Sequence, residues 1–186
     1  MVEEMTKTWY GILLKYIFLI LLVLCAGNWA MSLVSFGHTD VTGMVGMDKG
    51  QIETILQISL TDDPDMAKKI NQYSGKKPTV DGAKGIGIVY IDGVRIGLHI
   101  DSGSYSMYGV NIGDSESTTE KNITYKYEGR FEVLDDVILG NSTADFYYNK
   151  KKGDCLVVIY NDYSNKVVAL TYFNNVNIVT KNLSGF

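Results

Sequence analysis

The sequence is poor in the residues that build metal centres, disulfides and nucleophilic sites. Its 186 residues include only two cysteines and two histidines. Two histidines without a cysteine cluster cannot form a common zinc site unless carboxylates supply most of the ligands. Cys25 lies in a long apolar run and Cys155 in a predicted strand, so the two cannot plausibly pair. We therefore expect no metal, no cofactor and no disulfide within the domain that follows the apolar run.

The sequence also has no excess of positively charged residues over negatively charged ones. The chain has 17 Lys and Arg against 21 Asp and Glu, a formal net charge of −4. Four of these charged residues precede residue 38, two of each sign, so residues 38–186 carry the same net charge. A nucleic-acid-binding domain normally shows a basic footprint. We therefore expect no nucleic-acid partner.

Catalytic patterns are weak. Asp92, His99, Ser102 and Ser104 include the residue types of a hydrolytic triad, but closeness in sequence is not geometry. His99 falls on the polar side of a predicted strand, where a solvated or hydrogen-bonded imidazole is the ordinary role. We therefore expect no catalytic residues and a protein that is not an enzyme. The alternative is a secreted or surface-anchored hydrolase that uses His99 as its base.

The strongest positive feature is an uncharged run over residues 16–36. Its 21 residues are enough for a helix rising about 1.5 Å per residue to cross a hydrocarbon core of about 30 Å. Trp9 with Tyr10 and Trp29 would lie about 30 Å apart along that helix, as aromatic belts do, and Lys15 would extend to the nearer interface. The run predicts a transmembrane signal-anchor over residues 9–36 that contacts membrane lipid through these four side chains.

Two other interpretations of the run stay open. The segment could be a cleaved signal peptide, with a mature chain beginning at Gly27 or Asn28, or a lipoprotein signal modified at Cys25. The apolar character resumes after Asn28, which favours an uncleaved anchor. Lys7 and Lys15 precede the run, and no lysine follows it before Lys49. The positive-inside rule then predicts a cytoplasmic tail over residues 1–8 and an extracytoplasmic domain anchored in the cell membrane by a single pass.

Helix and strand signals follow one another after residue 37. Asp48 predicts the start of a short helix that ends at Leu56, and Asp63-Pro64 predicts the start of a second. Apolar residues then alternate on either side of Asp92-Gly93, which is a strong hairpin signal. Later strands are predicted over 144–148, 155–160 and 166–173, and the middle one lacks alternation, as a strand covered on both faces does.

A repeat is suggested by the two halves of the domain. Gly43 to Asp48 opens the first half much as Gly109 to Asp114 opens the second. We therefore predict an α+β fold with two helix-then-hairpin repeats, over residues 37–106 and 107–186. Their antiparallel sheet would carry short helices packed on one face.

Four segments of the domain resemble tandem-repeat modules of the β-lactamase-inhibitor-protein-like group. They are residues 41–60 and 85–100 in the first half and residues 107–124 and 144–173 in the second. They are also similar to SmpA/OmlA-type envelope lipoproteins and to the domain that accompanies CAP domains in Gram-positive surface proteins. The resemblance implies a protein-binding or envelope-organising role on an antiparallel sheet, with no catalytic residues.

A binding face is predicted where the sheet would be open to solvent. Arg95 and His99 alternate with apolar residues and would point away from the helices. Tyrosines are frequent in the second half, and Tyr147, Tyr160 and Tyr172 are candidates for an aromatic patch on that face. The sequence thus predicts a membrane-anchored, extracytoplasmic interaction module of a bacterial cell envelope, with an envelope protein or glycan as partner.

Overall fold

The computed structural model describes residues 37–135 and 142–179. Contacts divide the chain into residues 1–37 and residues 38–186. The predicted tail, the predicted anchor with Trp9, Tyr10, Lys15 and Trp29, and the possible processing sites at residues 25–28 all lie outside the described residues. Among the helices in the described ranges, none is long and apolar enough to cross a membrane.

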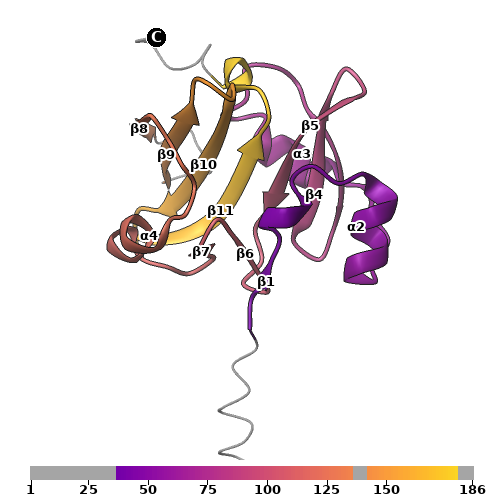
Figure 1. Ribbon diagram of the computed structural model, residues 1–186, viewed down its shortest axis with the longest axis horizontal. Coiled ribbons are helices and arrows are strands. Elements are labelled where there is room, and N and C mark those ends of the chain that lie inside the picture. Colours follow the sequence, from indigo (N-terminus) through magenta and orange to yellow (C-terminus); the bar gives the residue numbers. More distant parts are fainter. Residues whose placement is uncertain (1–36, 136–141, 180–186) are drawn as a thin grey trace, which may run out of the picture. The chain divides into compact units, whose positions relative to one another are not determined.

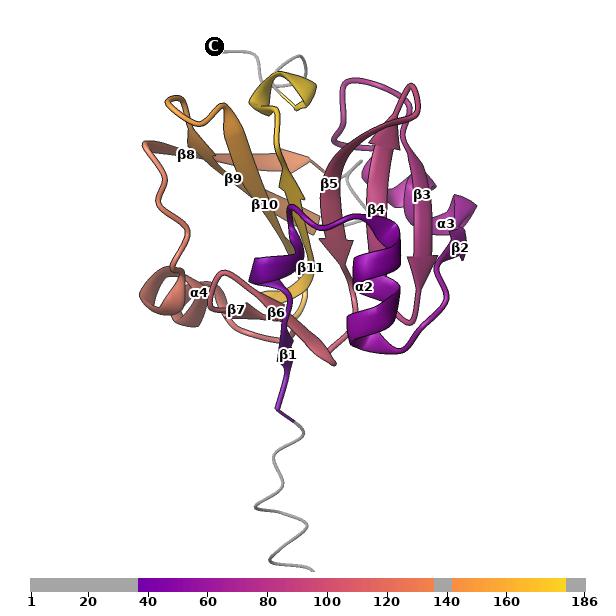
Figure 2. The same cartoon turned by 45° about the vertical axis from the view of Figure 1, so that its right-hand side comes forward.

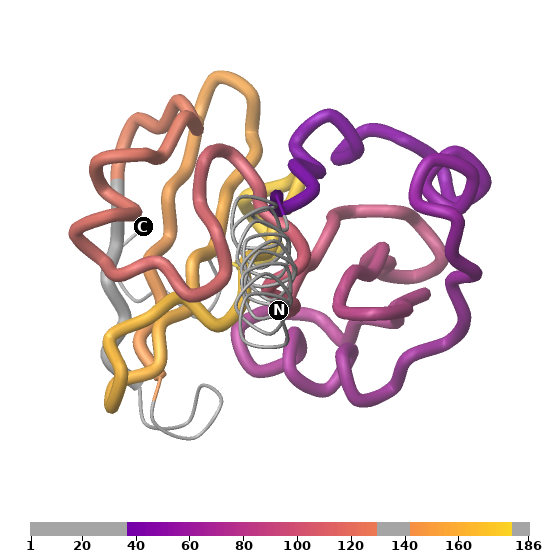
Figure 3. The backbone as a smooth tube through the Cα atoms, turned by 90° about the horizontal axis from the view of Figure 1, so that it is seen from below, coloured from indigo at the N-terminus to yellow at the C-terminus, as the bar shows by residue number. Residues whose placement is uncertain are grey.

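An eight-stranded antiparallel sheet dominates the domain (Figures 1 and 2). Its spatial order is β2-β3-β4-β5-β11-β10-β9-β8, so two four-stranded meanders meet where β5 pairs with β11. The strands are β2 (Thr61–Asp62), β3 (Thr79–Ala83), β4 (Ile86–Ile91), β5 (Val94–Ile100), β8 (Gly129–Asp135), β9 (Ser142–Asn149), β10 (Asp154–Asn161) and β11 (Lys166–Phe173). Seen from below, the two meanders form two sides of the domain (Figure 3).

Tight turns connect the strands of the first meander. Asp92 and Gly93 have φ angles of 52° and 74° between β4 and β5, and Lys84 and Gly85 have φ angles of 51° and 80° between β3 and β4. Two successive positive φ angles are typical of the type I′ turns that match the twist of a hairpin. The hairpin predicted at Asp92-Gly93 is confirmed.

The two meanders approach closely at one glycine. Gly97 of β5 lies opposite Phe173 of β11, and a Cβ atom at Gly97 would collide with the carbonyl oxygen of Tyr172. The join between β5 and β11 therefore requires a residue without a side chain at this position.

A small three-stranded sheet lies beside the join. Its β1 is parallel to β6, and β6 is antiparallel to β7. Backbone bonds from Thr39 N to Ser104 O and from Val41 N to Ser106 O, both 2.9 Å, attach the beginning of the domain to the segment after β5. The elements are β1 (Thr39–Asp40), β6 (Tyr105–Met107), β7 (Val110–Asn111) and the 3₁₀ turn η1 (Thr42–Met44).

Three short helices begin at side-chain caps. Asp48 accepts a bond from the backbone N of Gln51, whose side chain in turn accepts one from the backbone N of Asp48. Asp63 and Ser115 cap the other two helices. The two predicted helix starts at Asp48 and Asp63-Pro64 are confirmed. The helices are α2 (Lys49–Leu56), α3 (Pro64–Ile70) and α4 (Glu116–Asn122).

The large sheet is covered on both faces by separate hydrophobic clusters. On the face that we call the first, Ile52 of α2 packs with the cluster containing Leu98 and Leu156. On the second face, Ile70 of α3 packs with the cluster containing Val157, and the 3₁₀ turn η2 (Val176–Ile178) completes this cover. Leu156 and Val157 are neighbours in β10 and are both fully buried, which confirms the prediction of a strand covered on both faces.

The predicted fold class is wrong. The described chain is mostly sheet with three short helices, instead of an α+β fold of two helix-then-hairpin repeats with the helices on one face. The helices lie on both faces of the sheet, since α2 packs on the first and α3 on the second. Residues 129–135, which carry no clear sequence signal, form the outer strand β8, because pairing with β9 supplies their backbone partners.

Candidate functional site

The five side chains predicted to bind a partner do not form an exposed face. Tyr147, Tyr160 and Tyr172 belong to the core of the first face, and His99 is 1% exposed on the opposite side of the sheet. Arg95 is partly buried. The predicted open face is therefore covered, and the residues are divided between two faces.

A β-bulge separates Arg95 from His99. Val89 of β4 pairs with Gly97, whereas the next residue, Tyr90, pairs with Arg95, so Ile96 is an extra residue in β5. An extra residue reverses the alternation of the strand from that point. Strict alternation along the sequence predicted one shared face for Arg95 and His99, and the bulge removes it.

Arg95 lies against the first-face cover. Its Nη2 donates to the carbonyl oxygen of Met44 at 3.1 Å, and burial lowers the pKa of its guanidinium. Its Nε finds no hydrogen-bond partner among the described residues. Arg95 thus holds the segment around η1 against β5, which is a structural role.

His99 belongs to a buried polar chain on the second face. Its Nδ1 lies 2.7 Å from Oγ1 of Thr171, which in turn lies 2.7 Å from the hydroxyl oxygen of Tyr73. On the other side of the ring, Nε2 is 3.8 Å from Oδ2 of Asp101, too far for a hydrogen bond but close enough for an electrostatic interaction. The same Asp101 oxygen accepts a bond of 2.7 Å from Nζ of Lys69. We call these five residues the His99 chain.

Two neighbours of Asp101 act on its protonation. The His99 imidazole and the Lys69 ammonium hold the pKa of the Asp101 carboxyl well below its usual range. A hydrolytic base must reach the proton of a substrate directly or through one water. His99 is 1% exposed, so its ring has no such access in this arrangement.

A second buried polar group lies on the first face. Asp154 accepts a bond of 2.7 Å from the Tyr125 hydroxyl and one of 2.9 Å from the Tyr172 hydroxyl. Burial and the Asp154 carboxylate raise the pKa of both phenols. We call these three residues the Asp154 cluster. Sequence analysis missed it, because no spacing in the chain connects Tyr125 with residues 29 and 47 positions later.

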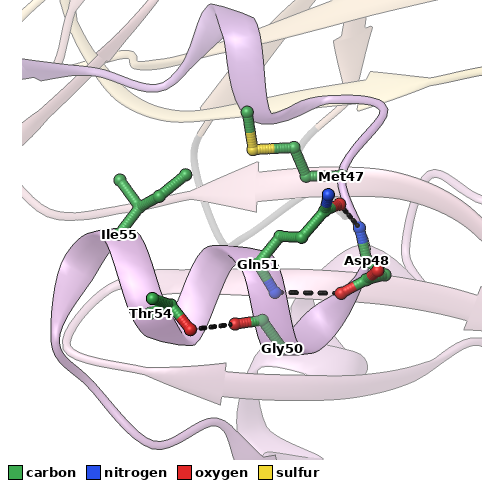
Figure 4. Close-up of a pocket in the computed structure, with 6 residues that line it drawn as sticks. All are labelled: Met47, Asp48, Gly50, Gln51, Thr54 and Ile55. Atoms are coloured by element: carbon green, nitrogen blue, oxygen red, sulfur yellow. Dashed lines mark hydrogen bonds between the residues drawn. The ribbon is translucent and has the colours of Figure 1, made fainter.

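One surface hollow, of about 420 Å³, lies along α2 (Figure 4). Ile55, which is 52% exposed, lines one end of the hollow, and Asp48 and Gln51, the capping pair of α2, line the other end. The Thr54 hydroxyl donates to the carbonyl oxygen of Gly50 at 2.7 Å and so offers little to a ligand. The hollow is shallow and apolar, with its polar groups already engaged.

A second hollow, of about 340 Å³, lies between α3 and the beginning of β3. Pro64, Ala67 and Pro78 give it apolar walls, while Lys68 and Lys77 bring two ammonium groups to it. Asp62, Asn71 and Thr79 complete the lining. Sequence analysis assigned no binding role to any of these residues.

Metal and thiol chemistry have few candidates in the described ranges. Residues 37–135 and 142–179 contain no group of three or more His, Cys, Asp or Glu side chains placed to hold a metal ion. Cys155 is buried in the second-face core, and burial raises the pKa of its thiol, which lowers its reactivity.

Comparison with known proteins finds little. No protein family and no curated protein matches the sequence. A cysteine-rich secretory protein from Staphylococcus aureus matches with a TM-score of 0.40 and 13% identity, over 74% of this chain and 50% of that one. An extracellular protein containing a SCP domain from Bacillus anthracis matches with a TM-score of 0.32 and 8% identity, over 64% and 45%. The chain spans about half the length of the solved structures it matches, and similarity at this level carries no argument about fold or function. The resemblance to β-lactamase-inhibitor-protein-like and SmpA/OmlA-type modules stays a prediction.

Proposed function

We propose that residues 38–186 form a non-enzymatic interaction module on the outside of a bacterial cell, held in the cell membrane by a single-pass amino-terminal anchor. The observation that carries the non-enzymatic part is the burial of His99 between Thr171 and Asp101. The histidine that the rival hydrolase would need as its base is part of the core. Within residues 37–135 and 142–179, loops and the two hollows described above are surfaces that a partner could contact.

The anchor and the location rest on the sequence. Residues 16–36 carry no charge, and lysines precede the run without following it closely. Protease added to wall-free cells that carry the full-length chain should digest residues 38–186 and spare a tag fused before residue 1. Protection of residues 38–186 would contradict the location, and a mature chain starting at Gly27 or Asn28 would contradict the anchor.

A direct test of the interaction role uses the full-length chain in intact cells. A photo-crosslinking residue at position 55, in the hollow along α2, should capture a defined envelope protein or glycan. The matched control carries the crosslinker at Val94, which is exposed, directly follows the Asp92-Gly93 turn and lies outside both hollows. Equal capture from the two positions would contradict a specific partner at the hollow.

The rival function has its own assay. The purified full-length chain should show no turnover on a panel of ester, amide and peptidoglycan-type substrates. Turnover that disappears in His99→Gln, while the variant keeps the circular dichroism spectrum of the parent, would replace the proposed role by the hydrolase.

A further inference from the structure

One end of the large sheet collects lysines from segments that are far apart in the sequence. In an antiparallel sheet, alternate connections lie at the same end. The approaches to β3 and β8, the β9–β10 turn and the segment after β11 therefore share one end, with η2 at the top in Figures 1 and 2. We call it the basic end. Its lysines are Lys76, Lys77, Lys126, Lys150, Lys151 and Lys152.

Backbone hydrogen bonds make these segments neighbours. Gly75 N donates to Ile178 O at 2.6 Å, and Val176 N donates to Gly153 O at 2.7 Å, so η2 links the approach to β3 with the β9–β10 turn. Lys126 joins them because its carbonyl oxygen accepts a bond of 2.9 Å from Nδ2 of Asn149. The lysines thus belong to one continuous surface.

The basic end stands out in an acidic protein. All six lysines are exposed, whereas the exposed carboxylates at this end are Glu128 on the approach to β8 and Asp92 in the β4–β5 turn. A local excess of positive charge in a chain of net charge −4 attracts anions to one place.

Two further features extend this surface. Lys77 also lines the hollow between α3 and β3, where Lys68 adds another ammonium group and Asp62 one carboxylate. Next to Lys126, Tyr127 is 46% exposed and is held by an edge contact with Tyr147, with ring centroids 4.8 Å apart. An exposed ring beside positive charge suits the apolar face of a sugar or polyol.

We propose that the basic end binds an anionic surface polymer with phosphodiester-linked repeating units. Lysines carry compact, hydrated charges on flexible side chains. Unlike the planar guanidinium of arginine, they do not form the paired hydrogen bonds that recognise a single carboxylate. Their distribution over three segments suits an extended polyanion better than one small anion. The strand β1, which follows residues 1–37 in the sequence, lies at the opposite end of the domain, which favours a polymer over lipid headgroups (Figure 2). The proposal rests on the extracytoplasmic role proposed above.

The test measures binding of the full-length chain, in non-ionic detergent, to a fluorescein-labelled glycerol phosphate oligomer by anisotropy. If five lysines each neutralise one phosphate, affinity should fall about a hundredfold between about 50 and 200 mM salt. The variant K150Q/K151Q/K152Q should bind at least about tenfold more weakly, and its log–log salt slope should be smaller by about 2.

A matched control changes the net charge equally at the other end of the sheet. The variant K84Q/K121Q/K166Q removes three exposed lysines from the β3–β4 turn, α4 and the start of β11. It should bind the oligomer within about twofold of the parent at high salt, where long-range effects are screened. Thermal unfolding of both variants shows whether each is folded.

Three results would overturn the proposal. The first is no salt-dependent binding, or equal weakening by the two triple variants. The second is displacement of the oligomer by phosphatidylglycerol in mixed micelles at equal phosphate, which would indicate a lipid site. The third is tighter binding of oligothymidylate than of the oligomer, which would indicate a nucleic-acid surface. If the basic end binds no polymer, crosslinked capture at position 55 can still succeed, and the proposed function then stands. Protease protection of residues 38–186 would instead contradict the proposed function itself.

Discussion

The two faces of the large sheet bury polar groups in different ways. On the first face, the Asp154 cluster is closed, because both carboxylate oxygens accept phenol donors within the core. On the second face, the His99 chain runs from buried Tyr73 through Thr171 to Asp101 and ends at the partly exposed Lys69. One network is isolated from solvent, and the other reaches it.

The difference indicates which kind of change destabilises each face. In the Asp154 cluster two donors depend on one residue, so losing that residue leaves two buried hydroxyls without partners. In the His99 chain each inner member has a neighbour on either side, and only the outer end carries a full ion pair. We therefore expect a single substitution to lower the free energy of unfolding most when it lies on the first face. We expect a change of pH to alter the free energy of unfolding mainly through the second face.

The largest effect is expected from Asp154→Ala. Removing the carboxylate should lower the free energy of unfolding by about 2 to 5 kcal/mol, because the Tyr125 and Tyr172 hydroxyls each lose an acceptor. Urea unfolding followed by circular dichroism measures the loss. Asp154→Asn keeps one acceptor oxygen and should lose clearly less; an equal loss in both variants would show that the phenol bonds are not the cause.

A smaller effect is expected from Thr171→Val on the second face. Valine keeps the shape of the side chain but breaks the contacts with both Tyr73 and His99, at a cost of about 2 kcal/mol. Thr171→Ser keeps the hydroxyl and loses a methyl group, at about 1 kcal/mol. Urea unfolding of the two variants measures both costs. If serine proves as destabilising as valine, packing and not the polar chain determines the stability of this face.

The last comparison, and the sharpest contrast between the faces, concerns acid. Because the folded-state pKa of Asp101 lies below its unfolded value of about 3.9, its contribution to stability is fully present above that value and is lost as the pH falls toward the folded-state pKa. The urea midpoint of the parent should therefore fall more steeply below about pH 4 than that of Asp101→Asn. Asp81→Asn is the control and should change the profile little, because the Asp81 carboxylate, which pairs with Lys49, is more exposed than that of Asp101. Parallel profiles for the parent and Asp101→Asn would contradict the prediction.

Local features of the fold were predictable from the sequence. A cap such as Asp48 or Asp63 acts on backbone groups within three residues, and the Asp92-Gly93 turn needs only two positive φ angles, so both signals are written in adjacent residues. The candidate binding residues were not predictable in the same way. Their assignment to one open face assumed unbroken alternation in β5 and an uncovered side of the sheet, and the bulge at Ile96 and the packing of α3 remove both conditions.

By itself, the sequence determined the helix starts, the first hairpin and the double-sided burial of β10, because each depends on residues that are neighbours along the chain. Only the tertiary structure decided which strands meet, that β5 joins β11 at Gly97, and that His99 lies between Thr171 and Asp101. It also brought lysines from three separate segments to the basic end. These arrangements arise from pairing and packing between residues that are far apart along the chain, and such contacts leave no local pattern in the amino-acid order.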